Sequence, residues 1–164
     1  MKTAALVLCA ALLAGCATLD RDARLRPGES RDADVMAIYG PPTRVWPEPG
    51  GGRTLEYSTQ PRGKHCYMVH LGADGRLIGV EDGLSPASRA RIEPGMTPEQ
   101  VSRILGSERS RVFYRNSGEE VWDWTIEPEQ SGYGMRFNVY FKDGRVLRSG
   151  QSMVFPSRFF GLDD

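Results

Sequence analysis

The side chains best suited to metal or thiol chemistry lie in one short segment that holds His65, Cys66 and His70. Side chains along an extended strand alternate between its two faces, so only Cys66 and His70 share a face. A structural zinc ion takes four ligands, and two on one strand leave the others unidentified. The alternative is a half-exposed strand that carries a small buried or edge thiol. We favour this alternative and expect no bound metal and no cofactor.

The sequence lacks the signatures of the common enzyme classes. It contains no Gly-x-Ser-x-Gly, no His-Glu-x-x-His, no phosphate-binding loop and no dinucleotide fingerprint. Its 21 Lys and Arg residues balance 21 Asp and Glu residues, whereas a nucleic-acid surface needs a basic stripe. We therefore predict a protein that is not an enzyme and that binds neither nucleic acid nor a small-molecule substrate.

The first residues have the layout of a bacterial secretory signal. Lys2 supplies a positive charge, and the apolar run from 4 to 14 precedes a cysteine. This run is too short to span a bilayer, which takes about 20 apolar residues. The segment Leu13-Ala14-Gly15-Cys16 resembles the lipobox of bacterial lipoproteins. The resemblance implies removal of residues 1–15, a diacylglycerol on the sulfur of Cys16, and a fatty acid such as palmitate on its new amino group.

The implied anchor predicts where the mature chain resides. Several acyl chains hold a protein to a bilayer stably, whereas a single chain binds only marginally. Residue 17 is Ala rather than the Asp that the lipoprotein rule links to the inner membrane. The resemblance therefore implies the outer membrane of a Gram-negative cell, with the protein lipid-anchored, facing the periplasm, and held by a polar tether at residues 16–24.

Cys66 is the one thiol that this interpretation leaves, because Cys9 departs with the signal and Cys16 is acylated. The periplasm favours disulfides, yet no second cysteine remains for an intramolecular bridge. Cys66 is therefore either buried and inert or available for an intermolecular disulfide.

Two copies of one unit follow the tether. Leu25–Ser30 recurs as Ile92–Thr97, and Asp74–Leu77 recurs as Asp143–Val146. The landmarks keep one order, with offsets between 66 and 69 residues. The sequence thus divides into a signal peptide at 1–15, the tether at 16–24, repeat 1 at 25–83, a linker at 84–91, repeat 2 at 92–153 and a C-terminal tail at 154–164.

Each copy combines a short helical pattern with a stretch of period-2 alternation. In the second copy, Thr97 is the expected N-cap and Gln100 its capping-box partner; in the first, Ser30 or Asp32 is the expected cap and Gly40 the end of the helix. Helices this short are not stable alone and must pack on something. We expect antiparallel strands at Arg44–Trp46, Thr54–Thr59, Cys66–Leu71 and Leu77–Glu81, and at Ser110–Arg115, Glu120–Ile126, Met135–Phe141 and Val146–Ser152.

The predicted fold class is therefore α+β, with two tandem repeats. Each repeat is a short helical segment packed on a three- to four-stranded antiparallel meander sheet. A unit of about 60–70 residues is only marginally stable by itself, so we expect the two units to pack together.

The second copy carries a recognisable pattern. Gly95-Met96-Thr97, Val101 and Leu105-Gly106, followed by an aromatic pair and an Asp-Gly turn, resemble the BamE/SmpA/OmlA superfamily. This resemblance implies a small outer-membrane lipoprotein related to an accessory subunit of the machinery that inserts β-barrel proteins. The doubled unit resembles the architecture of the secreted β-lactamase inhibitory protein. The chain departs from the assembly subunit in having two units, and Ser107 stands where that family has Pro.

An open sheet face is the candidate binding site. If Tyr67, Val69 and Leu71 face the helix, the alternate residues of that strand lie on the opposite face. A face rich in Met, His, Tyr, Arg and Asn suits protein recognition; the alternative is an ordinary solvated face. The tail around Phe159-Phe160 is a second candidate. The predicted partner-binding residues are Met68, His70, Asp123, Arg136, Asn138 and Tyr140.

These observations favour an outer-membrane lipoprotein that acts as a non-catalytic periplasmic binding or scaffold module, in outer-membrane protein assembly or envelope maintenance. Its expected partners are the membrane, through the N-terminal lipid, and a protein of the envelope. The alternative function is an inhibitor-like module that binds a periplasmic enzyme such as a β-lactamase, which the doubling of the unit motivates.

Overall fold

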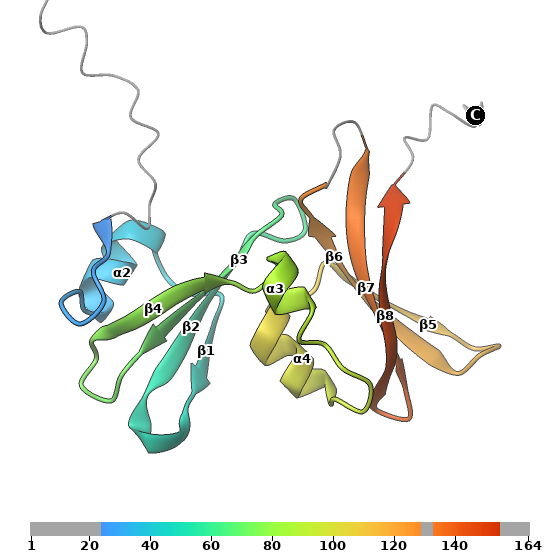
Figure 1. The fold of residues 1–164 in the computed structure, drawn as a ribbon, viewed down its shortest axis with the longest axis horizontal. Coiled ribbons are helices and arrows are strands. Elements are labelled where there is room, and N and C mark those ends of the chain that lie inside the picture. The colour runs from blue at the N-terminus through green and yellow to red at the C-terminus, as the bar shows by residue number, and fades with distance from the viewer. Residues whose placement is uncertain (1–23, 129–132, 155–164) are drawn as a thin grey trace, which may run out of the picture.

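A computed structural model describes residues 24–128 and 133–154 (Figure 1). The predicted signal peptide, the predicted acylation site Cys16 and nearly all of the predicted C-terminal tail lie outside the described residues. Within the described ranges, no helix combines the length and the apolar character that a membrane crossing needs.

The first unit is a helix on a four-stranded sheet. Helix α2 (Asp32–Tyr39) precedes a sheet with the strand order β1-β2-β3-β4, here called sheet 1, in which every pairing is antiparallel. A short 3-10 turn, η3 (Pro49–Gly51), lies between its first two strands. The core between α2 and the sheet is formed by Leu25, Val35, Leu55, Tyr57, Val69, Leu71 and Leu77. The strands are β1 (Arg44–Pro47), β2 (Arg53–Ser58), β3 (Cys66–Leu71) and β4 (Leu77–Asp82).

The second unit repeats this plan. Helix α4 (Pro98–Leu105) precedes another antiparallel sheet, here called sheet 2, with the order β5-β6-β7-β8. Its apolar face, with Val101, Ile104 and Leu105, packs on Trp122, Trp124, Phe137 and other inward side chains of the sheet. The strands are β5 (Ser110–Tyr114), β6 (Glu119–Ile126), β7 (Gly134–Lys142) and β8 (Arg145–Val154). The predicted fold class, an α+β pair of tandem units, is confirmed.

The two sheets share a detail that supports their repeat relationship. In sheet 1 the register of the last strand pair shifts between His70 and Leu71, and in sheet 2 it shifts between Tyr140 and Phe141. Each shift inserts one extra residue, Ile78 or Leu147, three positions after the turn glycine. A β-bulge at the same place in both hairpins is a feature that tandem copies of one unit inherit.

The expected N-cap of α4 is confirmed, whereas that of α2 is wrong. Thr97 accepts a hydrogen bond from the N–H of Gln100, whose side chain accepts one from the Thr97 N–H. Helix α2 instead begins after Arg31, whose N–H donates to the carboxylate of Asp34 at 2.8 Å. Neither expected residue caps it, because Ser30 accepts from the Arg26 N–H and Asp32 forms an ion pair with Arg53.

The predicted linker is not an open connection. It contains a short helix, α3 (Pro86–Arg89), in which the hydroxyl of the N-cap Ser85 accepts from the Ser88 N–H at 3.2 Å. Leu84 and Ile92, on either side of α3, are buried in the core of the second unit. The segment therefore fastens the two units to each other.

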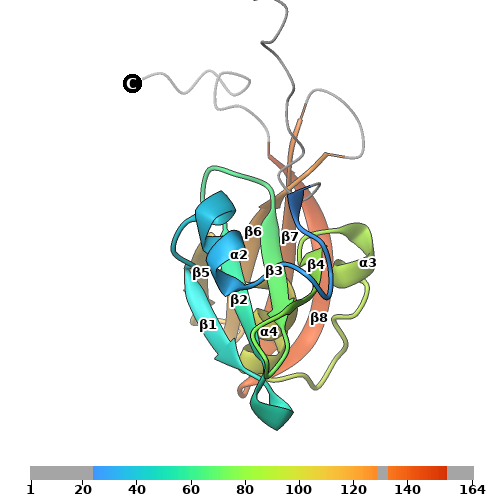
Figure 2. The ribbon, with the colours of Figure 1, turned by 90° about the vertical axis from the view of Figure 1, so that its left-hand side faces the viewer.

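The elements form four layers, in the order α2, sheet 1, α4 with α3, and sheet 2 (Figure 1). In the view from the α2 side, sheet 1 lies behind the helix and sheet 2 lies farther back (Figure 2). Helix α4 packs on sheet 2 with one side and meets sheet 1 with the other, because Cys66 and Met68 of β3 belong to the same core cluster as Leu105. The two units thus share a core.

This shared core corrects one predicted site residue. Met68 was expected on an open face, but it is fully buried against the second unit, as is Cys66. The expected alternation along β3 is right, since Val69 and Leu71 face α2. The opposite face is covered by an element that follows some 30 residues later in the chain.

Candidate functional site

Among the described helices and strands, none covers the face of sheet 2 that points away from α4. Trp122, Trp124 and Ile126 of β6 face the core, so the alternate residues of β6 and their partners face outward. The register of the ladders places these side chains side by side across four strands. We call this surface the outer face; it comprises Val112, Tyr114, Glu119, Val121, Asp123, Thr125, Arg136, Asn138, Tyr140, Arg148 and Ser152.

A cluster of three side chains occupies the part of the outer face nearest the Asp143-Gly144 turn. The guanidinium of Arg148 lies 3.9 Å from the ring centroid of Tyr140 and hydrogen-bonds both carboxylate oxygens of Glu119, at 2.7 and 3.1 Å. The hydrogen bond from Arg148 lowers the pKa of Glu119, and the same bond raises the pKa of Arg148. Tyr140 is therefore held flat beneath a fixed cation, with its orientation set before any partner arrives.

Two further predicted residues lie beside this cluster. The side-chain amide of Asn138 donates to the hydroxyl of Ser152 at 2.9 Å, and Arg136 is half-buried on the same face. The structure thus brings together Arg136, Asn138 and Tyr140, each half-buried, on one face of sheet 2, and their contact with a partner stays a prediction.

Asp123 lies on this face but is buried, with 7% of its surface exposed. Its carboxylate accepts from the guanidinium of Arg109 and from the hydroxyl of Ser110, and this ion pair covers it. A carboxylate already held by a cation and a hydroxyl has little capacity left for a partner. The prediction that Asp123 is a partner-contacting residue is therefore wrong, and its role is to fix the start of β5.

The outer face is the repeat equivalent of the buried face of sheet 1. The ladder pairs Glu56 with Met68 in sheet 1 and Asp123 with Asn138 in sheet 2. Each position on the buried face thus has a counterpart on the outer face. The counterparts are Cys66 and Arg136, Met68 and Asn138, and His70 and Tyr140.

The buried face of sheet 1 shows how such a surface is covered. Glu56, fully buried, accepts hydrogen bonds from the indole of Trp46 at 3.0 Å and from the N–H and hydroxyl of Ser107, at 2.8 and 2.5 Å. Gly106 lies so close to Cys66 that a Cβ there would sit 2.2 Å from the sulfur. The end of α4 is thereby locked onto sheet 1.

Burial also decides between the two predictions for Cys66. Its side chain is inaccessible and unpaired with any other described cysteine. Burial raises the pKa of the thiol well above its ordinary value, and the nearby carboxylates of Glu56 and Asp82 raise it further. A thiol that stays protonated at neutral pH is neither a nucleophile nor a metal ligand. The predicted burial is confirmed, and the lack of reactivity stays a prediction.

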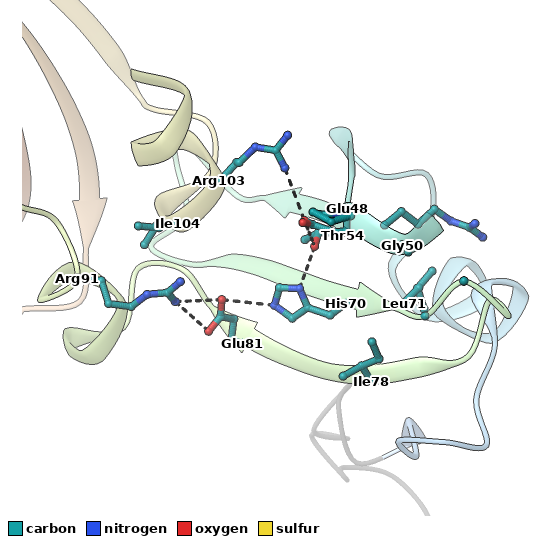
Figure 3. Close-up of a pocket in the computed structure, with 15 residues that line it drawn as sticks. Glu48, Gly50, Thr54, His70, Leu71, Ile78, Glu81, Arg91, Arg103 and Ile104 are labelled. Carbon is teal, nitrogen blue, oxygen red and sulfur yellow. Dashed lines mark hydrogen bonds and ion pairs between the residues drawn. The ribbon is translucent and has the colours of Figure 1, made fainter. Parts of the chain in front are cut away.

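His70 shares a face with Cys66 but lies beyond the edge of α4, in a pocket of about 630 Å³ (Figure 3). Its Nδ1 is 2.9 Å from the hydroxyl of Thr54, which also bonds the carboxylate of Glu48 at 2.9 Å. Because the carboxylate only accepts, Thr54 donates to it and must accept from Nδ1–H. The other ring nitrogen lies 3.4 Å from Glu81.

Arg91, which follows α3, and Arg103 of α4 close this polar chain. Arg91 donates to Glu81 at 3.3 Å, and Arg103 lies 3.7 Å from Glu48 and donates to the Pro47 carbonyl at 3.2 Å. His70 is thus engaged in a network that ties sheet 1 to the second unit (Figure 3). It is separated from the outer face by the whole thickness of the second unit. In the described part of the chain, no group of three or more His, Cys, Asp or Glu side chains is arranged to hold a metal.

Arg148 and Glu119, which fix Tyr140, are not among the residues predicted from the sequence. The period-2 alternation of the last strand places Arg148 on the same face as Ser152, so the pattern held a signal. What it lacked was the register across the bulge, which sets Arg148 directly opposite Tyr140.

Comparison with known proteins gives distant similarities. No family model matches the chain. It is 32% identical over 69 residues to the outer membrane protein assembly factor BamE of Neisseria meningitidis, a match that covers 40% of this chain and 53% of that protein. The chain therefore matches about half the length of this relative.

Two solved structures align with the chain at low similarity. A candidate β-lactamase inhibitor protein from Streptococcus mutans aligns with a TM-score of 0.32 and 12% identity, covering 75% of this chain and 82% of that one. An extracellular protein with an SCP domain from Bacillus anthracis aligns with a TM-score of 0.34 and 9% identity, covering 88% of this chain and 54% of that one.

Proposed function

We propose that this protein is an outer-membrane lipoprotein that serves as a non-catalytic binding or scaffold module in the periplasm, in outer-membrane protein assembly or envelope maintenance. Its lipid is attached at Cys16, and its partner is a protein of the envelope. The partner docks on the outer face of sheet 2, around Arg136, Asn138 and Tyr140.

The observation that carries this proposal is the contrast between two equivalent faces. The face of sheet 1 is covered by α4, whereas no described helix or strand covers its counterpart on sheet 2, which has polar and aromatic residues in place of Cys66, Met68 and His70. Tyr and Arg are the side chains that most often dominate protein–protein interfaces. Tyr140 is already ordered by Arg148, so a partner would find it preorganised and bind at a lower entropic cost.

The similarity to BamE supports the setting of this function. That relative is an outer membrane protein assembly factor, and the chain starts with a segment that resembles a lipoprotein signal. The proposed anchor at Cys16 predicts that metabolic labelling with a palmitate analogue marks the wild-type chain in the outer-membrane fraction. The Cys16→Ser variant should lose the label and leave that fraction.

The docking surface is tested by photo-crosslinking in cells. A photoreactive phenylalanine analogue replaces Tyr140 in the full chain, and crosslinked species are identified by mass spectrometry. The matched control places the same analogue at Val45, which is half-exposed on sheet 1. We expect a discrete envelope-protein adduct from position 140 and none from position 45. Adducts of equal yield from both positions, or none from position 140, would contradict the proposed site.

The identity of the captured protein separates the two functions. Components of the β-barrel insertion machinery would support the scaffold role. A soluble periplasmic hydrolase would support the inhibitor-like alternative, and purified protein should then inhibit that hydrolase, with the Arg136→Glu variant losing inhibition.

A further inference from the structure

The exposed apolar side chains of the described residues are most concentrated in strand β5. Val112, Phe113 and Tyr114 follow one another and are 45%, 63% and 53% exposed. Three consecutive exposed apolar residues are unusual on a soluble surface unless they serve a contact. Because β5 is the first strand of sheet 2, these residues also lie along an open sheet edge.

The two sheets have four edge strands, and the other three carry features that discourage pairing. Strand β1 ends in Pro47, which has no N–H to donate. Strands β4 and β8 each contain a bulge, at Ile78 and Leu147, which distorts the edge. Strand β5 has no proline, no lysine and no register shift along its ladder with β6. Its edge is therefore the one that a further strand can extend.

We propose that the chain forms a homodimer in which β5 pairs antiparallel with β5 of a second copy, joining the two sheets 2 into one eight-stranded sheet. The twofold axis passes between the two copies of Phe113. This register places Phe113 opposite Phe113 and Val112 opposite Tyr114, twice.

The sequence of β5 is complementary to itself in this register. Aromatic pairs and aromatic pairs with β-branched residues are among the favourable cross-strand combinations, each worth about 0.2–1 kcal/mol. All three exposed side chains of each copy are covered by apolar partners, and the outer polar groups of the backbone find ladder hydrogen bonds. In a closed twofold contact both β5 edges are paired, so neither remains open to a third chain. A head-to-tail contact would leave one edge open.

Two symmetry-related pairs in this register bring like charges together, since Arg111 of each copy lies opposite Arg115 of the other. The charge of Arg111 is already compensated within its own copy, since its guanidinium bonds Glu108 at 2.5 Å and lies 3.9 Å from the Trp122 ring centroid. Arg111 therefore lies against its own sheet, and the repulsion is weak. The twofold axis is perpendicular to the joined sheet, so the α2 helices of both copies lie on the same side of it, and each lies away from β5, across the layers of its own copy (Figure 1).

The first test is the mass of the full-length chain in detergent, measured by light scattering that separates protein from micelle. We expect twice the mass of one chain for the parent and a single chain for Phe113→Glu. The matched control is Ile78→Glu, because Ile78 is 65% exposed on another edge; it should remain dimeric. A single-chain mass for the parent, or a dimer that survives Phe113→Glu, would overturn the proposal.

The second test fixes the register by disulfide trapping. A Phe113→Cys chain should crosslink to itself under mild oxidation. Chains with Val112→Cys and Tyr114→Cys should crosslink when mixed, but neither should do so alone, because like positions then lie farther apart than the roughly 7 Å limit for a disulfide. Buried Cys66 does not compete. Self-crosslinking of the Val112→Cys chain would refute this register, and crosslinking of Phe113→Cys only to another protein would refute the second copy as partner.

Discussion

The carboxylate of Glu56, in sheet 1, accepts hydrogen bonds from the backbone N–H and the hydroxyl of Ser107, the second residue after α4, at 2.8 and 2.5 Å. This contact crosses the boundary between the units; Glu56 is fully buried and Ser107 is half-buried. Helix α4 is therefore held by two sheets, and the units should unfold together.

Replacement of Glu56 by Ala should destabilise the whole chain. The substitution leaves the Trp46 indole and the Ser107 N–H buried without an acceptor, and we expect a loss of about 3 kcal/mol in the free energy of unfolding. The control is Glu29→Ala, which removes an exposed carboxylate and should cost little. Chemical denaturation followed by Trp fluorescence and by far-UV circular dichroism measures both. A Glu56→Ala chain as stable as the control would contradict the proposed lock.

Gly106 should tolerate no side chain. An added Cβ would lie 2.2 Å from the Cys66 sulfur, and the backbone has φ = +74°. Gly40 has nearly the same conformation, φ = +78° and ψ = −160° against +74° and −166°, with nothing near its Cβ position, so Gly40→Ala reports the backbone strain alone, about 1–3 kcal/mol. We expect Gly106→Ala to cost at least about 2 kcal/mol more. In a Cys66→Ala background this excess should shrink; an unchanged excess would show that the sulfur is not the obstacle.

The Cys66 thiol should be unreactive toward thiol reagents in the native protein. At pH 8, a thiol reagent should modify it only after denaturant is added, because burial raises its pKa. The same shift affects stability. The thiol's pKa is higher in the folded chain, so its contribution is fully present below its ordinary value of about 9 and is lost as the pH rises above it. Tyr57 also has a raised pKa and lowers stability in the same way as the pH rises. The Cys66→Ala variant retains this effect, so the difference between the two chains in the slope of unfolding free energy against pH isolates the contribution of the thiol. Equal slopes would contradict the prediction.

The pKa of Glu119 should depend on Arg148. The hydrogen bond from Arg148 lowers this pKa, so its stabilising contribution is present above the carboxyl's ordinary value and is lost as the pH falls through the lowered one. In Arg148→Ala the pKa, followed by carbon NMR of the carboxylate, should move back toward 4.5. Because the pair is exposed to solvent, 1 M salt should also reduce the shift in the parent. A pKa that is the same in the variant would show that the contact is not formed.

All eight strands could be predicted from sequence, because period-2 alternation bounded by turn residues is a local signal. The cap at Thr97 was equally local. The prediction failed for Met68. Period-2 alternation shows on which face of a strand a side chain lies, but not which element packs on that face, and here the packing residue is Leu105, far along the chain. Asp123 failed for a related reason: the cation that buries it, Arg109, lies outside any strand pattern.

The α2 cap could not be predicted for a different reason. Ser30, Asp32 and Asp34 all have oxygens that suit a helix start, so composition alone leaves several choices. The carboxylate of Asp32 forms an ion pair with Arg53 and is therefore not available as the helix cap. This ion pair forms only when sheet 1 has folded, because Arg53 belongs to β2.

Cys66 is equivalent to Arg136, and Met68 is equivalent to Asn138. The chain can therefore be described as an array of repeats that ends at its second unit. Repeat proteins end their arrays with modules whose outward surface is hydrophilic, and without such a terminal module the array would keep recruiting copies. Here the exchange of two apolar side chains for polar ones distinguishes the inner layer from the last one. The second unit is therefore a capping repeat. Reversing that exchange with Arg136→Cys and Asn138→Met would make the outer face of sheet 2 apolar and able to bind a further copy.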